Sequence, residues 1–120
     1  MKVEYLNFDG RERPYSQAVR AGGFVYTAGA SIGDPGDDIE AQTAKTIEYL
    51  SDVLKQAGTD LQHVVKASVF LADIGEWGRF NEVWKRYFPT NKPARTTTQV
   101  GKFGGTTKIE IDFVAALPGD

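Results

Sequence analysis

The stretch NKPARTTTQVGKFGGTTKIEIDFVAAL, residues 91–117, decides how the second half of the chain is expected to fold. It reads as two strands around Gly104 and Gly105. A Gly-Gly pair suits a two-residue hairpin turn because both residues accept positive φ angles. With that turn, Thr98 faces Ile111 across the hairpin. The stretch therefore predicts an antiparallel hairpin at the end of the chain.

The predicted hairpin has one apolar and one polar side. Six residues make up the apolar side, which is expected to lie under the helices: Thr96, Thr98, Val100, Ile109, Ile111 and Phe113. The polar side carries Arg95, Thr97, Gln99, Glu110 and Asp112. A register slip would mix the two sets, so the pattern supports this register.

Arg95 and Glu110 carry opposite charges on this polar side. In the predicted register Glu110 faces Gln99, and Arg95 lies further along by roughly 13 Å, at ~3.3 Å per residue. The two side chains therefore form no simple ion pair within one chain. A bulge or a neighbouring subunit would bring them together. The alternative is that both are solvated surface charges or members of an interface ion-pair network.

Upstream of the hairpin, the hydrophobic pattern predicts strands at 2–8, 18–21, 24–30 and 64–73. Helices are expected at 39–57 and 77–88. Asp37 and Glu40 have the spacing of a capping box at the start of the first helix, and Gly58 suits the position after its end. The order of elements is β-β-β-α-β-α-β-β.

Each expected helix has one apolar stripe. The first stripe consists of Ile47, Leu50, Leu54 and Ala57, and the second of Trp77, Phe80, Trp84 and Phe88. The aromatic stripe indicates core packing rather than a base-stacking platform, since few basic residues flank it. The fold class is therefore α+β, a mixed six-stranded sheet with two helices on one face. The opposite face, with its polar residues, stays uncovered.

Length and composition restrict the classes of protein. The 120 residues are expected to form one domain, 1–120. The net charge of −2, without a basic run, argues against nucleic acid or a membrane surface as partner. With no cysteine and one histidine, His63, expected at the surface, no metal site is expected. The N-terminus lacks a signal-peptide pattern and no apolar run is long enough to span a membrane, so a cytoplasmic location is expected.

Five short motifs are similar to those of one protein family. In chain order they are RPYSQAV (13–19), VVKASVFLAD (64–73), FNEVWKRYF (80–88), PAR (93–95) and KIEIDFVAA (108–116). Their order and spacing resemble the RidA family (YjgF/YER057c/UK114), the reactive intermediate deaminases. The resemblance extends from about Pro14 to Leu117.

The resemblance implies a chorismate-mutase-like fold that assembles into a homotrimer. In such a trimer the sheets form a central barrel with the helices outside, and clefts lie between subunits. The implied activity is hydrolysis of imines and enamines to 2-keto acids and ammonia, so the partner is a small molecule. No cofactor is implied.

The resemblance also implies roles for individual residues. Arg95 matches an arginine that holds the substrate carboxylate, because a guanidinium presents paired donors. Glu110 matches a glutamate that positions or activates water. Tyr15 is either a cleft residue or an interface aromatic with a satisfied hydroxyl. Asn81 either supports the site or is a surface polar residue, and Thr97 lies where the family uses main-chain atoms.

The chain departs from the family pattern at residues 28–30. The family usually has Ser-Gly-Gln here, whereas this chain has Ala28, Gly29 and Ala30. The retained Gly29 preserves close backbone approach to a substrate. Arg13 is a second departure, because many relatives have glycine there, and it adds positive charge near the cleft.

Three functions are consistent with the sequence. The first is an imine and enamine deaminase. The second is a non-catalytic trimer that binds small carboxylates or protein partners, with Arg95 as the clamp. The third is a specialised pathway deaminase, such as one acting on 2-aminomuconate. The retained Glu110 favours catalysis, whereas Ala28 and Ala30 favour specialisation.

Overall fold

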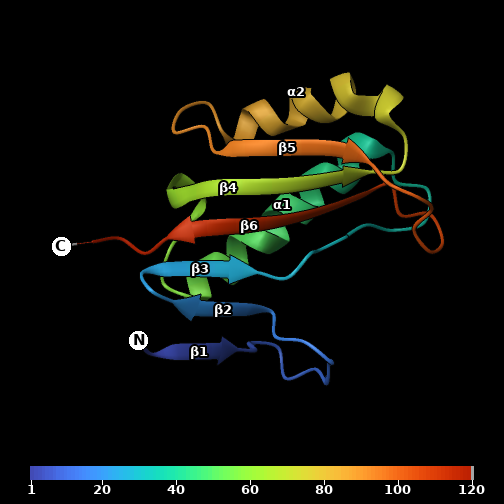
Figure 1. The fold of residues 1–120 in the computed structure, drawn as a ribbon. Coiled ribbons are helices and arrows are strands. Elements are labelled where there is room, and N and C mark those ends of the chain that lie inside the picture. Colours follow the sequence, from blue (N-terminus) through green and yellow to red (C-terminus); the bar gives the residue numbers. More distant parts are fainter. Residues whose placement is uncertain (120) are drawn as a thin grey trace.

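Six strands form one sheet with two helices packed on one face (Figure 1). The computed structural model describes residues 1–119. The strands are β1 (Val3–Leu6), β2 (Ala18–Ala21), β3 (Phe24–Thr27), β4 (Val64–Leu71), β5 (Ala94–Gln99) and β6 (Ile109–Ala116). The helices are α1 (Ile39–Gln56) and α2 (Trp77–Tyr87), and short 3-10 turns precede β4 and α2. The predicted order of strands and α-helices is confirmed.

The strand order across the sheet is β1-β2-β3-β6-β4-β5. β4 and β5 are parallel, and every other neighbouring pair is antiparallel, so the sheet is mixed as predicted. The predicted terminal hairpin is wrong, because β4 lies between β5 and β6 (Figure 1). The segment around Gly104 and Gly105 is not a two-residue turn. It is part of a longer loop that connects β5 to β6 past the end of β4.

The faces predicted for β5 are wrong for the same reason. Arg95 pairs with Ala67 of β4, which pairs with Phe113 of β6. Ala67 and Phe113 are buried under the helices, so Arg95 lies on the helix side of the sheet. By strand alternation Thr97 and Gln99 share that side, whereas Thr96 and Thr98 lie on the open face. The sequence ARTTTQ is polar at nearly every position, so its pattern specifies no face.

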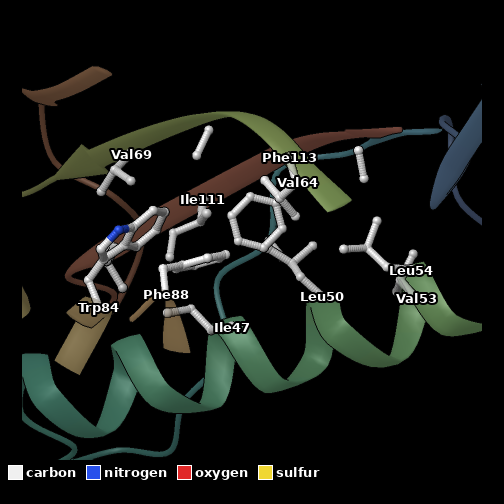
Figure 2. Packing of buried hydrophobic residues seen from close by; sticks show 14 of the residues in the cluster. Ile47, Leu50, Val53, Leu54, Val64, Val69, Trp84, Phe88, Ile111 and Phe113 are labelled. Atoms are coloured by element: carbon white, nitrogen blue, oxygen red, sulfur yellow. The ribbon is translucent and has the colours of Figure 1, made fainter. Parts of the chain in front are cut away.

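The apolar core lies between the helices and the sheet. Ile47, Leu50 and Leu54 of α1 are fully buried, as the helical stripe predicted. They point toward β6, where Ile111 and Phe113 are also buried (Figure 2). Burying each such side chain stabilises the fold by about 1.5–3 kcal/mol. This layer holds α1 and β6 in fixed positions.

The N-cap of α1 lies one residue after the predicted position, whereas the glycine after the helix end is where it was predicted. The N-cap is Asp38, whose side chain accepts a hydrogen bond from the Ala41 N–H at 2.8 Å. Asp37 instead pairs with Lys45 at 2.7 Å in the preceding loop. At the other end Gly58 has φ of 99°, the left-handed conformation expected of a glycine after a helix.

The face of the sheet opposite the helices is more apolar than predicted. Tyr5 is 72% exposed and Tyr26 is 45% exposed there, and Phe24 is exposed beside them. Polar residues occupy the β4–β5–β6 part of this face, including Ser68 and Asp112, which pair across β4 and β6. None of the helices within residues 1–119 has the length and apolarity that crossing a membrane requires.

Candidate active site

Arg95 lies on the edge strand β5, against the aromatic face of α2. Its guanidinium carbon is 4.9 Å from the ring centroid of Phe80, 5.0 Å from that of Trp84 and 5.6 Å from that of Trp77. Cations over aromatic rings at such distances are stabilised electrostatically. The rings hold the half-buried guanidinium in place without neutralising its charge.

Asn81 is the hydrogen-bonding partner of Arg95. Its Oδ1 accepts a hydrogen bond from Arg95 Nη1 at 2.9 Å. Asn81 lies one residue after Phe80 on α2, so the same helix supplies both the ring and the amide. The contact brings together two of the residues that were predicted for the site. It occupies one part of the guanidinium and leaves the other donors available.

Arg95 takes part in none of the ion pairs formed within residues 1–119. Burial lowers the pKa of its guanidinium, yet an arginine stays charged at neutral pH. A partly buried cation without an anion is costly. The position therefore favours an anionic ligand, and a planar fork of donors fits a carboxylate.

Glu110 lies near the start of β6 on the open face of the sheet. It pairs with Phe70 of β4 and approaches Gly29, the residue that follows Ala28 after β3. A Cβ atom added to Gly29 would lie 2.7 Å from Glu110 Oε2. Gly29 therefore leaves just enough space for this carboxylate, and no larger residue fits without moving it.

The structure divides the six predicted site residues into two groups. Arg95, Asn81 and Thr97 lie at the β5–α2 edge on the helix side. Glu110 and Gly29 lie on the other side of the sheet, and Gly29 lines a pocket that Tyr15 also lines. The prediction that Arg95 and Glu110 share one face is wrong. One chain does not bring the two charges together.

Sequence reasoning assigned the aromatic stripe of α2 to the core alone. Phe80 and Trp84 are buried, as predicted, but both also contact the Arg95 guanidinium. Trp77 is 43% exposed, so its assignment to the core was wrong, and it is the third ring that contacts the Arg95 guanidinium. The signal that would have revealed this was the β-α-β order at 64–99, which is typical of a parallel strand pair with its helix packed beside it.

Metal-ligating side chains do not gather in the described part of the chain: residues 1–119 contain no group of three His, Asp or Glu side chains suited to a metal. His63 is half-exposed and its Nδ1 lies 2.7 Å from Asp60 Oδ1 within the turn before β4. That contact gives the single histidine a local structural partner.

Known proteins are similar to this chain in both sequence and fold. A family described as Endoribonuclease L-PSP matches residues 10–117. The mitochondrial protein mmf2 of Schizosaccharomyces pombe is 44% identical over 113 residues, covering 86% of this chain and 87% of that protein. A human protein named 2-iminobutanoate/2-iminopropanoate deaminase is 36% identical over 108 residues, covering 85% of this chain and 79% of that protein.

A solved structure agrees with the arrangement of the sheet and helices. A YjgF/YER057c/UK114-family protein from Mycobacterium tuberculosis superimposes with a TM-score of 0.87 at 30% identity, covering 97% of this chain and 100% of that one. The family match spans most of the chain and all five motifs noted in the sequence. The chain therefore belongs to the Endoribonuclease L-PSP family, which is the RidA (YjgF/YER057c/UK114) family that those motifs resemble.

Proposed function

We propose that this protein hydrolyses reactive 2-imino acids and their enamine tautomers to 2-keto acids and ammonia. The observation that carries the proposal is Arg95, a half-buried guanidinium that forms no ion pair within residues 1–119. A 2-imino acid supplies the carboxylate that this position favours. The deaminase name of the human relative supports the same substrate class.

The reaction needs a carboxylate clamp and a placed water. Water adds to the imine carbon, the C=N double bond becomes a C–N single bond, and the tetrahedral intermediate then expels ammonia to leave C=O. Arg95 holds the carboxylate next to the reacting carbon. Glu110 accepts a proton from the attacking water or orients it, and that proton ends on the departing nitrogen. The chemistry consumes one water and needs no cofactor.

The separation of Arg95 and Glu110 bears on assembly. They lie on opposite faces, so the proposed site joins Arg95 of one copy to Glu110 of another. We further propose a homotrimer in which the open sheet faces pack together. The exposed aromatic residues of that face, Tyr5, Phe24 and Tyr26, support this arrangement because exposed aromatic surface is a mark of protein interfaces.

The remaining residues take supporting roles in the proposal. Asn81 orients the guanidinium through its 2.9 Å hydrogen bond. Gly29 makes room for Glu110, and Tyr15 forms part of the wall of the adjoining pocket. Thr97 contributes main-chain atoms next to Arg95. One domain, 1–120, and a cytoplasmic location complete the proposal, although the fission yeast relative is mitochondrial.

The deciding experiment measures 2-keto acid release from imines generated in situ by an amino-acid oxidase. With the protein present, keto acid should form faster than by spontaneous hydrolysis, and Arg95→Ala should remove the difference. Equal rates with and without the protein, over the imines of small, branched and acidic amino acids, would contradict the proposal. Binding of a keto acid without acceleration would instead indicate a carboxylate-binding trimer.

A further inference from the structure

Two large apolar side chains are exposed at the start of α2. Ile74 is 45% exposed and Trp77 is 43% exposed. Ile74 begins the 3-10 turn Ile74–Glu76, and Trp77 is the first residue of α2, so the two lie three residues apart in continuous helical backbone. Side chains at that spacing share one face of a helix. They therefore form one exposed apolar surface, which we call the Ile74–Trp77 surface.

This surface adjoins the proposed carboxylate clamp. The Arg95 guanidinium carbon lies 5.6 Å from the ring centroid of Trp77. The other two rings around the guanidinium, Phe80 and Trp84, are only 0% and 6% exposed, so Trp77 is the most accessible of the three. In a 2-imino acid the side chain begins at the imine carbon, which is itself bonded to the carboxylate. A substrate whose carboxylate is held by Arg95 can therefore lay its side chain on the indole of Trp77.

Hydrogen bonds hold the Ile74–Trp77 surface beside β5. The Ile74 N–H donates to Gln99 Oε1 at 2.9 Å. Gln99 is the last residue of β5 and lies on the same side of the sheet as Arg95. Asp73 also caps the turn through its side chain, which accepts a hydrogen bond from a main-chain N–H at 2.8 Å. Because the surface is already in place before a ligand arrives, binding costs little further ordering.

The one cation of residues 74–79 is already occupied by carboxylates. Arg79 Nη2 lies 2.7 Å from Glu40 Oε1 of α1, and Arg79 Nη1 lies 3.6 Å from Glu76 Oε2. Side chains two residues apart do not share a helix face, so Arg79 is directed away from Trp77. A second acidic group on the substrate would gain no ion pair from this segment, whereas an apolar group on Trp77 would be removed from water.

We propose, building on the proposed function, that the Ile74–Trp77 surface is the subsite for the substrate side chain. The substrate class is then 2-imino acids with large apolar side chains, such as the branched imine formed from leucine. Arg95 binds the carboxylate, and the side chain packs on Trp77 and reaches Ile74. One methylene group in an apolar pocket typically changes kcat/KM by about 10–200-fold, and a partly exposed surface is expected at the lower end of that range.

The test compares the imine of leucine with that of alanine, each formed in situ by an amino-acid oxidase at matched supply. The parent protein should favour the leucine imine in kcat/KM by at least about tenfold. Trp77→Ala and Ile74→Ala should each remove most of that preference. Both imines carry the same carboxylate, so any disturbance of Arg95 would lower both rates together, and the ratio reports the side chain alone.

Val65→Ala is the matched control. It removes an apolar side chain that is 44% exposed at the opposite end of β4, and it should keep the parental preference. Three results would overturn the inference: a parent without preference, an unchanged preference in either Trp77→Ala or Ile74→Ala, or the same loss in Val65→Ala.

Calorimetry separates this inference from the proposed reaction. 4-Methyl-2-oxopentanoate, the keto acid of leucine, should bind more tightly than pyruvate, and Trp77→Ala and Ile74→Ala should each reduce the difference. If neither imine is hydrolysed but this binding difference holds, the proposed reaction fails and the apolar subsite stands. If the two keto acids bind equally, or neither binds, the subsite is wrong.

Discussion

Arg95 and Glu110 lie on opposite faces of one sheet, on strands separated by β4. Arg95 pairs with the buried Ala67, which faces the helices. Glu110 pairs with Phe70, which faces the open side of the sheet. A clamp and a water-placing group on opposite faces cannot serve one small substrate within one subunit. The relationship makes assembly a condition of the proposed activity.

Arg95→Ala should abolish imine hydrolysis. Hydrogen bonds to a charged group contribute about 1.5–3 kcal/mol each, so losing a paired contact predicts a fall in kcat/KM of roughly 10²–10⁴-fold. Arg95→Lys should rescue poorly, because an ammonium lacks the planar fork. Steady-state kinetics with oxidase-generated imines measures both variants.

The control for Arg95 is thermal unfolding. Removing this half-buried cation should change the melting temperature little, since the desolvation cost that disappears with it offsets the lost contacts with the aromatic rings and Asn81. A lysine variant as active as the parent would show that Arg95 is not the clamp.

Glu110→Gln should lower kcat with little effect on keto-acid binding. Glutamine keeps the size and some hydrogen bonding but cannot accept the proton, and general-base contributions are typically about 10²–10⁴-fold. If Glu110 only orients water, the loss falls to about tenfold, or ~1.4 kcal/mol. Single-turnover hydrolysis beside calorimetry measures the two quantities.

A purely structural Glu110 predicts a different pattern. The melting temperature or the assembly state would then change, with activity falling only in proportion. Unchanged hydrolysis of every imine tried would remove Glu110 from the mechanism.

Mixed assemblies should regain activity that neither inactive parent has. When Arg95→Ala and Glu110→Gln subunits are co-expressed with different tags, a cyclic trimer that contains both variants, and in which each site uses neighbouring subunits, has both groups intact at one site in three. Purification over both tags followed by the imine assay measures this. Light scattering should give the mass of three chains for the parent.

Two results would contradict this arrangement. A stable monomer at micromolar concentration would exclude the trimer. Mixed assemblies as inactive as their parents would show that Arg95 and Glu110 do not belong to one shared site.

Gly29→Ala should impair catalysis without unfolding the protein. The added Cβ would lie 2.7 Å from Glu110 Oε2, so the flexible carboxylate must move. Misplacing a reacting group by about 1 Å can cost roughly 10²-fold in rate. Gly101→Ala is the matched control, because a Cβ atom there has no neighbour within 4 Å. Equal activity of the two variants would show that the Gly29–Glu110 contact is unimportant.

The pair of Glu4 and Arg20 should contribute stability that disappears in acid. Hydrogen bonds from Arg20 lower the pKa of Glu4, and Arg20 Nη1 also donates to the Ala57 carbonyl at 2.5 Å, joining β2 to the end of α1. A carboxyl with a lowered folded pKa stabilises the fold above its unfolded pKa of about 4.3 and loses that effect as pH falls through the folded value.

The Glu4→Gln variant tests this assignment. Its melting temperature should be lower than that of the parent at pH 7, and the gap should close below about pH 4. Glu12→Gln changes an exposed carboxyl that makes no ion pair within residues 1–119 and should show no such gap. A gap that is constant with pH would contradict the assignment.

Most of the fold was predictable because apolar periodicity reports burial directly. The stripe of α1 and the alternation of β6, with Ile109, Ile111 and Phe113 inward, are both as expected. The partner of β5 was not predictable in the same way. ARTTTQ is polar on both sides, so neither face nor neighbour follows from its pattern.

The members of the candidate site could be proposed from the sequence, but their geometry could not. The motifs pointed to Arg95, Asn81 and Glu110, and the glycine retained at residues 28–30 added Gly29; the structure places them as two neighbouring pairs. Which pair lies on which face depends on β4 entering between β5 and β6, a long-range pairing that no local signal encodes.

The central position of β6 has a consequence for synthesis of the protein. β6 pairs with β3 on one side and with β4 on the other. Without β6 the sheet would be two separate parts, β1–β2–β3 and β4–β5. During translation, β1–β2–β3 and β4–β5 are two separate ribbons until residues 109–116 leave the ribosome. The nascent chain must therefore wait for residues 109–116 before the two halves join, and a chain without this strand would expose the edges of β3 and β4 that it covers.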